Sequence, residues 1–434
     1  MQTYNFSAAD FQTMQKDMFK FLFDFTAIPS VSSDEKEACE YIYQEFFKLP
    51  GVVVERQYLD NSIMDDPYWN PGPYFANDYT GHFNVIATWK GTGEQAPVYV
   101  NAHIDTVMAC SPDLMPPHAD DDDRIYGLGV HDDKGHVAAI YGAFKYLSEH
   151  NVKLPFDVIG HLVVEEEIGG NGSLWAVRHA KEKGQCALML DGNEGLLMHA
   201  CRGCIWPRIT CTGISCHPGD RKKQKFASAY DYLQKAIEDV REAHAEYCAW
   251  LKDHPVKYFE DEVPPLNIGM IHAGNWPATV PTEAFTQMVY GVFPGADYNI
   301  NSVERKRIED KLATDPDLAG HYKVEFTFDV MAGVTDVEDP LVQEFHQAAV
   351  DADLSATIGV FNAACDIGFY RNLMGVPAIC PDTPVLRKTP TILYWADGFT
   401  DPKPFRSDFA RPADDDRETL FHVECGHASQ FLDW

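Results

Sequence analysis

The stretch VYVNAHIDTV, residues 98–107, indicates how the rest of the chain folds. Its first residues are rich in valine, which is typical of a strand, and it ends with His103 and Asp105. Residues two apart on a strand face the same side, so this His and this Asp lie together. An Asp beside a His accepts one ring N–H and leaves the other nitrogen for a metal ion. Alone, the pair also fits a strand that simply ends in polar residues.

The next motif is GLGVHDDKG, residues 127–135, which leads into the helical segment HVAAIYGAFKYLSEH. The motif lacks the spacing of a Walker loop or a dinucleotide-binding loop, which argues against a phosphate site. Asp132 and Asp133 between glycines suit a hard cation, and one carboxylate has two oxygens with which to bridge two metal ions. The alternative is a helix N-cap, where Asp is common and stabilising.

Acidic residues also end two further apolar segments. Glu165, Glu166 and Glu167 follow VIGHLVV, and Asp191 follows ALML. Neighbouring carboxylates repel one another unless a cation or a proton intervenes, and neighbours on a strand face opposite ways, so we expect these glutamates to differ in role. Ligands of open α/β sheets bind outside the carboxyl ends of the strands. One His and several carboxylates at that edge predict a site for zinc, manganese or cobalt.

Strand-like and helix-like segments alternate through the first 200 residues. The pattern predicts strands at 82–91, 96–107, 155–167 and 187–192, and helices at 9–28, 34–49, 136–150 and 173–184. Ser32 and Ser33 are the predicted N-cap of the second helix. The alternation predicts an α/β fold with a mixed, largely parallel sheet flanked by helices.

After about residue 200 the pattern changes to that of an α+β module. Helices are predicted at 227–254 and 302–313, among strands at 204–213, 283–293 and 321–331, before a helix at 339–352 and a strand at 375–380. We therefore predict a discontinuous α/β domain, residues 1–200 and 332–434, interrupted by an inserted α+β domain, residues 201–331.

Composition excludes several classes of protein. The 434 residues suffice for two or three domains, and a net charge of −31 argues against nucleic acid and anionic membrane surfaces as partners. No apolar run reaches the roughly 18 residues of a membrane span, and the N-terminal residues show no signal-peptide core. Eleven cysteines without a regular framework predict reduced thiols and a cytoplasmic location.

Together these motifs resemble those of the zinc-dependent peptidase/deacylase family of acetylornithine deacetylase, succinyl-diaminopimelate desuccinylase, glutamate carboxypeptidase and aminoacylase. NAHIDTV, GLGVHDDKG, EEEIGGNG and Asp191 match that family in order and spacing. SCHPG, residues 215–219, and GNWPATVP, residues 274–281, resemble parts of its inserted lid and dimerisation domain. The resemblance implies a zinc-peptidase-like catalytic domain with a ferredoxin-like lid, and a homodimer.

The resemblance also implies a set of metal ligands. Two Zn²⁺ ions per subunit are expected, with Co²⁺ or Mn²⁺ as alternatives. His103 and Asp191 would ligate the first ion, Glu167 the second, and Asp132 would bridge both. The Asp132–Asp133 peptide would be cis.

Three further residues receive catalytic roles from the resemblance. Asp105 would orient His103, and Glu166 would be the general base. His217 would reach the site of a neighbouring subunit and polarise the substrate carbonyl. The implied reaction is hydrolysis of an amide bond in a small N-acyl amino acid or dipeptide-like substrate, by a metal-activated water that Glu166 deprotonates.

The chain departs from the family pattern in two places. Gly291 stands where many members carry an arginine that binds a substrate carboxylate. The glycine-rich segment that carries the last His ligand is absent, Arg411 stands near its place, and only His422 and His427 follow. The fifth ligand is therefore a substitute, or the site holds one weak metal ion, or the chain is an inactive paralogue that acts as a binding protein. Phosphoryl hydrolysis is a rival reaction that fits the carboxylates but not the glutamate pair or the lid motifs.

Overall fold

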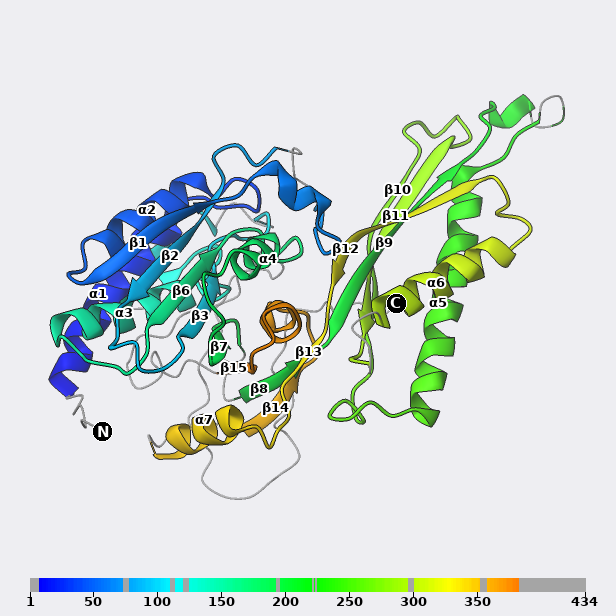
Figure 1. The fold of residues 1–434 in the computed structure, drawn as a ribbon. Helices are drawn as coiled ribbons and strands as arrows, with labels where there is room; N and C mark the ends of the chain where they lie inside the picture. Colours follow the sequence, from blue (N-terminus) through cyan, green and yellow to red (C-terminus); the bar gives the residue numbers. More distant parts are fainter. Residues whose placement is uncertain are drawn as a thin grey trace, which may run out of the picture.

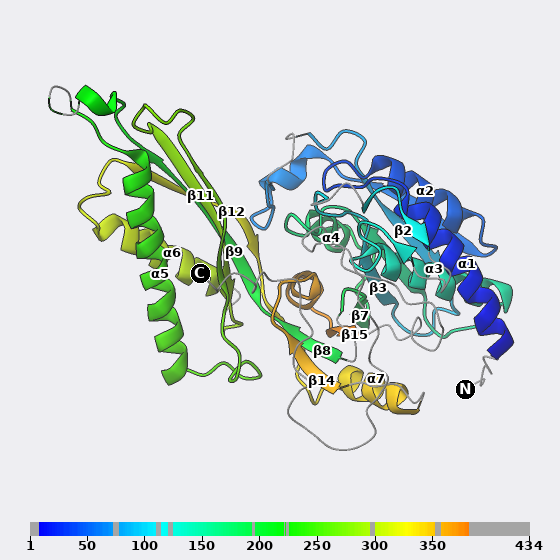
Figure 2. The ribbon, with the colours of Figure 1, turned by 180° about the vertical axis from the view of Figure 1, so that it is seen from behind.

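The protein folds into two units, each built on its own sheet (Figure 1). The computed structural model describes residues 8–72, 78–109, 114–119, 125–192, 196–220, 222, 225–295, 300–351 and 357–381. The views from front and back show the larger sheet with its helices beside a second, elongated unit (Figures 1 and 2). The predicted combination of a mixed α/β sheet and a separate α+β module is confirmed.

The larger sheet has nine strands in the order β1-β2-β6-β3-β7-β15-β8-β13, with β14 beside β8. Their bounds are β1 Val52–Tyr58, β2 Phe83–Trp89, β3 Val98–His103, β6 Val158–Val163, β7 Cys186–Met189, β8 Leu196–Cys201, β13 Gly333–Val334, β14 Thr357–Phe361 and β15 Ala378–Pro381. At its centre β3 runs parallel to both β6 and β7, whereas β1 and β2 pair antiparallel at one edge. A separate pair joins β4 (His118–Ala119) to β5 (Ile125–Tyr126).

Amphipathic helices cover this sheet because their apolar residues recur every three or four positions. The helices are α1 Ala8–Thr26, α2 Lys36–Phe47, α3 Lys134–Glu149, α4 Asn171–Arg178 and α7 Pro340–Asp351, with a π-helical segment, η4, at Phe369–Met374. On α3, for example, Val137, Ile140 and Phe144 are buried, and Tyr141 stacks on Phe21 of α1 with ring centroids 4.4 Å apart. None of the helices in the described ranges is long and apolar enough to cross a membrane.

The predicted N-cap of α2 is wrong. The cap position belongs to Glu35, which makes no side-chain capping bond. The Ser32 hydroxyl instead donates to Asp105 Oδ2 at 2.7 Å, and the Ser33 hydroxyl donates to Glu165 Oε1 at 2.8 Å. Both serines therefore donate hydrogen bonds to carboxylates at the edge of the sheet where the predicted metal ligands lie, and neither caps the helix.

In its described residues, the second unit, called the inserted unit below, has a four-stranded antiparallel sheet in the order β10-β11-β9-β12, two α-helices and a short 3-10 helix. Its elements are β9 Gly203–Thr212, η3 Pro218–Asp220, α5 Ala229–Asp253, β10 Leu266–Ala273, β11 Glu283–Val292, α6 Ile300–Thr314 and β12 Tyr322–Val330. Leu233, Ile237 and Val240 of α5 form its buried core with β9 and β11 (Figure 1). The predicted domain boundaries at 200/201 and 331/332 remain a prediction.

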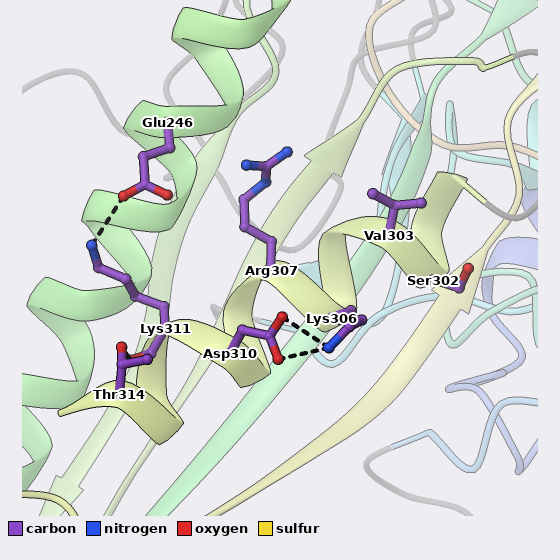
Figure 3. Close-up of a pocket in the computed structure, with 8 residues that line it drawn as sticks. All are labelled: Glu246, Ser302, Val303, Lys306, Arg307, Asp310, Lys311 and Thr314. Atoms are coloured by element: carbon purple, nitrogen blue, oxygen red, sulfur yellow. Dashed lines mark hydrogen bonds and ion pairs between the residues drawn. The ribbon is translucent and has the colours of Figure 1, made fainter. Parts of the chain in front are cut away.

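A hollow of about 600 Å³ lies where α6 faces α5 (Figure 3). Four of its charged side chains form two pairs: Lys306 Nζ lies 2.7 Å from Asp310 Oδ1, and Lys311 Nζ lies 3.0 Å from Glu246 Oε1. None of the predicted site residues lines this hollow.

Candidate metal centre

Neighbouring parallel strands bring the predicted ligands to one edge of the larger sheet. His103 is the last residue of β3, whose neighbours are β6 and β7. Glu166 and Glu167 lie in the turn after β6, and Asp191 follows the end of β7. Because the carboxyl ends of parallel strands point the same way, these residues meet without any long loop.

Three of the predicted ligands form one group. One ligand atom from each of His103, Asp132 and Asp191 lies within 4.8 Å of the other two. His103 is 1% exposed, and its Nε2 lies 2.8 Å from Asp132 Oδ1. A neutral imidazole nitrogen with two carboxylate oxygens is a donor set that suits Zn²⁺, so the residues present fit a metal ion.

Asp105 holds the other side of the His103 ring. His103 Nδ1 lies 3.3 Å from Asp105 Oδ1 and 3.0 Å from the Asp105 carbonyl oxygen. The same carboxylate accepts hydrogen bonds from the backbone N–H groups of Glu166, at 3.0 Å, and Glu167, at 3.2 Å. This one buried side chain therefore fixes the orientation of the His and also ties β3 to the glutamate turn.

The side chain of Asp133 contacts two histidines instead of capping a helix. It stands at the N-cap position of α3, but its side chain makes no capping hydrogen bond. Its Oδ2 accepts from the backbone N–H of His103 at 2.8 Å, and its Oδ1 contacts His136 Nδ1. The peptide between Asp132 and Asp133 is cis, as expected.

Glu165 differs from the two glutamates that follow it. It is fully buried, with a φ of 57°, and its carboxylate accepts hydrogen bonds from Ser33 Oγ, Tyr79 Oη and Asn171 Nδ2, each at 2.8 Å. These neutral donors satisfy its oxygens. By contrast, Glu166 and Glu167 are within range of the charges of His103 and Asp191.

The pKa values follow from burying several charges together. Burial raises the pKa of Glu167 and of Asp191 well above the ordinary range, and the charge of Asp132 adds to both shifts. Burial also raises the pKa of Glu166, against the opposing effect of His103. Burial alone would lower the pKa of His103, but the surrounding aspartates hold it well above its usual value. A bound cation would relieve this repulsion.

Sequence reasoning missed Asp366, which lies beside the group. Asp366 is 3% exposed, and burial raises its pKa to about 6. It accepts a hydrogen bond from the Ser173 hydroxyl, which in turn accepts from Asn101 Nδ2 at 2.8 Å. Its charge acts on Glu166 and Asp191. The available signal was a single acidic residue inside the otherwise uncharged segment VFNAACDIGFY.

Two other predicted positions lie away from the group. His217 is exposed, beside η3, and its Nδ1 accepts from the backbone N–H of Gly219 at 3.1 Å. Both views place η3 at the end of the inserted unit that is remote from the larger sheet (Figures 1 and 2). At Gly291, a Cβ atom would lie 2.4 Å from Pro265 Cδ, so β11 has no room there for an arginine. Arg411, His422 and His427 lie outside the described residues.

Comparison with known proteins supports the same grouping of motifs. The sequence profile of peptidase family M20/M25/M40 matches residues 99–384. A peptidase M20 domain-containing protein of Sordaria macrospora is 26% identical over 346 residues, covering 74% of this chain and 73% of that protein. An N-formyl-4-amino-5-aminomethyl-2-methylpyrimidine deformylase of Halalkalibacterium halodurans is 27% identical over 236 residues, covering 51% of this chain and 54% of the deformylase.

Solved structures share the fold at low identity. A dipeptidase from Saccharomyces cerevisiae has a TM-score of 0.67 at 15% identity, covering 86% of this chain and 90% of that chain. Human carnosine dipeptidase 1 has a TM-score of 0.64 at 13% identity, covering 86% of this chain and 91% of that chain. The profile match spans well over half the chain and includes every motif of the larger sheet that carries a predicted ligand. This chain therefore belongs to peptidase family M20/M25/M40.

Proposed function

We propose that this protein is a metal-dependent hydrolase that cleaves an amide bond in a small N-acyl amino acid or dipeptide-like substrate. The observation that carries the proposal is the convergence of His103, Asp132 and Asp191, with Glu166 and Glu167 on the adjacent turn. The names of similar proteins, which include a deformylase and dipeptidases, support chemistry on small amides.

In this proposal the site would hold two Zn²⁺ ions, with Co²⁺ or Mn²⁺ as substitutes. His103 and Asp191 would hold one ion, Glu167 would contribute to the second, and Asp132 would be shared by both. Zinc supplies a Lewis acid that polarises the amide carbonyl and lowers the pKa of water. Glu166 would take a proton from the attacking water and deliver it to the leaving amine.

We further propose that residues 201–331 are a lid and dimerisation domain and that His217 acts in the site of a partner subunit. β10 has a strand partner on one side only among the described strands, and it exposes Met270 and Ile271. Such an edge favours pairing across a two-fold axis. The remote position of His217 in its own chain supports the same arrangement.

The nine described cysteines form no disulfide, which supports a reducing, cytoplasmic location.

The test combines metal analysis with a substrate panel. The purified chain is reconstituted with zinc, cobalt or manganese and assayed against N-acetyl and N-formyl amino acids, dipeptides and a phosphate ester. We expect bound metal and hydrolysis of at least one amide. Asp191→Asn, which removes a ligand charge at constant shape, abolishes both, whereas Asp310→Asn on the exposed surface of α6 changes neither.

Two other outcomes of this test would favour the alternative functions. Hydrolysis of the phosphate ester alone favours the phosphoryl reaction. Absence of metal and of turnover, together with tight binding of a panel compound, favours an inactive paralogue that acts as a binding protein.

A further inference from the structure

Asn70 lies at the junction of the two units. It belongs to the segment between η1 (Asn61–Asp65) and β2, and it is 2% exposed. Figures 1 and 2 show this blue segment reaching from the larger sheet toward β12 of the inserted unit. The side-chain Oδ1 of Asn70 accepts a hydrogen bond from the backbone N–H of Asp329, on β12, at 2.6 Å.

The other groups of Asn70 bind the turn after β6. Its Nδ2 donates to the Gly169 carbonyl at 3.0 Å, its backbone N–H donates to Asn171 Oδ1 at 3.0 Å, and its carbonyl accepts from Asn171 Nδ2 at 2.8 Å. Gly169 has a φ of 124°, and a Cβ atom there would lie 2.5 Å from Asn70 Cβ. The turn and Asn70 are therefore in direct contact, and a displacement of one displaces the other.

This turn is the one that presents the glutamates. The backbone N–H of Gly169 donates to the Glu166 carbonyl at 2.9 Å, and that of Gly170 donates to the Glu165 carbonyl at 2.9 Å. Asn171 Nδ2 also donates to Glu165 Oε2 at 2.8 Å. The bonds that close the turn are thus continuous with the bonds that Asn70 makes.

On the inserted unit, the side chain of Asp329 is fixed by two hydrogen bonds from α6. Its Oδ1 accepts from Asn301 Nδ2 at 2.7 Å and its Oδ2 accepts from Arg305 Nη1 at 2.6 Å, both from α6. The pairing of β12 with β9 shifts register between Phe326 and Asp329. This shift lies next to the Asp329 N–H that donates a hydrogen bond to Asn70. α6, β12 and Asn70 therefore form one connected path to the glutamate turn.

We propose that Asn70 is a positioning residue that couples the orientation of the inserted unit to the turn carrying Glu166 and Glu167. The turn holds its closed geometry while β12 is docked on Asn70, and it loosens when β12 moves away. The inference rests on the proposed function in that it takes Glu166 and Glu167 as the working glutamates, but the contacts themselves are independent of that assignment.

Hydrogen exchange of the full-length, metal-free chain tests the coupling without any assay of activity. Asn70→Ala removes three side-chain hydrogen bonds, which join Asn70 to the Asp329 N–H, the Gly169 carbonyl and the Tyr68 carbonyl. We expect about tenfold faster exchange in peptides covering residues 164–172 and 326–331. Asn70→Asp keeps an acceptor for Asp329 and loses the donor to Gly169, so exchange rises in the turn alone. Lys257→Ala breaks an exposed ion pair between the units, with Asp336 at 2.9 Å, and leaves both peptides unchanged.

A double-mutant cycle separates coupling from a local structural role. Arg305→Ala removes the ion pair that holds Asp329 to α6. If the two units are coupled, this change speeds hydrogen exchange in the glutamate turn as well as in β12. In Asn70→Ala, the added Arg305→Ala then produces no further change in the turn. Additive effects, or a turn in Asn70→Ala that exchanges as in the unmodified chain, would overturn the proposal.

Two features keep the test decisive. If Asn70→Ala does not fold, as judged by exchange in β3 and β6, the cycle is run with Asn70→Asp. If the substrate panel fails while the cycle shows coupling, the proposed function is wrong and the coupling stands.

Discussion

At the scale of single residues, the proposed function gives the neighbours Glu166 and Glu167 different roles. We expect Glu166→Ala to retain zinc and to lose at least about 100-fold in kcat, because a general base acts on water rather than on the ion. We expect Glu167→Ala to lose zinc affinity as well as activity, because a proposed ligand is removed. Metal content by mass spectrometry and kcat of each variant check this.

The matched control for this pair is Glu165→Gln. This change preserves an acceptor for the neutral donors around the side chain, and Glu165 is not one of the proposed metal ligands. It should keep zinc and most of the activity. Equal loss of zinc in Glu166→Ala and Glu167→Ala, or full activity in the former, contradicts the assignment.

His161 gives a prediction about pH. Burial lowers its pKa to about 3, and its Nδ1 lies 2.7 Å from Tyr370 Oη. The unfolded chain takes up this proton below a pH of about 6.5, whereas the folded chain does not. The free energy of unfolding therefore falls as pH drops below about 6.5, by up to about 1.4 kcal/mol per pH unit from this group.

His161→Gln keeps an acceptor for Tyr370 without titrating. Between pH 7 and pH 5 we expect the free energy of unfolding in urea to fall by about 2 kcal/mol less in this variant than in the unmodified chain. His272→Gln, at an exposed position, serves as the control and should follow the unmodified chain. Parallel curves for all three proteins would refute this account.

At the scale of elements, the start of α4 depends on a glycine. A Cβ atom at Gly172 would lie 2.2 Å from the Val164 carbonyl oxygen, and Gly172 N–H donates to that same oxygen at 3.0 Å. Gly172→Ala should therefore cost about 2–4 kcal/mol of unfolding free energy and weaken zinc binding, because backbone must shift at the glutamate turn. Chemical denaturation and zinc titration measure the two effects.

Gly269→Ala on β10 is the control for this substitution. A Cβ atom there meets Asn267 Nδ2 at 3.5 Å, an ordinary contact. We expect a change below about 0.5 kcal/mol. Similar costs for the two variants would show that close packing at Gly172 is not the cause.

Sequence patterns predict well several elements that are buried in the larger sheet. β3 and β6 are apolar runs and α3 has apolar residues at helical spacing, and the structure buries all three. The strand-end rule places His103 and Asp191 together. β10 was missed because most of its side chains are exposed and carry no alternation. The functions of Ser32 and Asp366 depend on partners far away in the chain, which no local pattern contains.

At the scale of the whole molecule, the proposal of a shared site predicts complementation. Glu166→Ala lacks the base and His217→Ala lacks the residue that reaches across. Mixed under conditions of subunit exchange, the two inactive chains should regain up to about a quarter of the activity, because half of the subunits form mixed dimers and each of these has one intact site. Initial rates before and after exchange measure the recovery.

Sedimentation and a labelled partner chain verify that dimers form and exchange. A monomer in sedimentation, or no recovery despite proven exchange, would mean that His217 acts within its own subunit or has no role. Mixing Glu166→Ala with Asp191→Asn is the control, because both changes disable the same half-site and no recovery is expected.

The chain crosses to the inserted unit and returns at neighbouring points. Cys204 at the start of β9 pairs with Val330 at the end of β12, and Cys201 of β8 pairs with Gly333 of β13. A chimera that replaces residues 203–330 with the corresponding segment of a relative needs only two junctions, spaced as adjacent strands. Such a donor segment must also supply the backbone N–H that donates to Asn70 and the apolar side chains that pack on Ala200, as Phe259 and Phe293 do here.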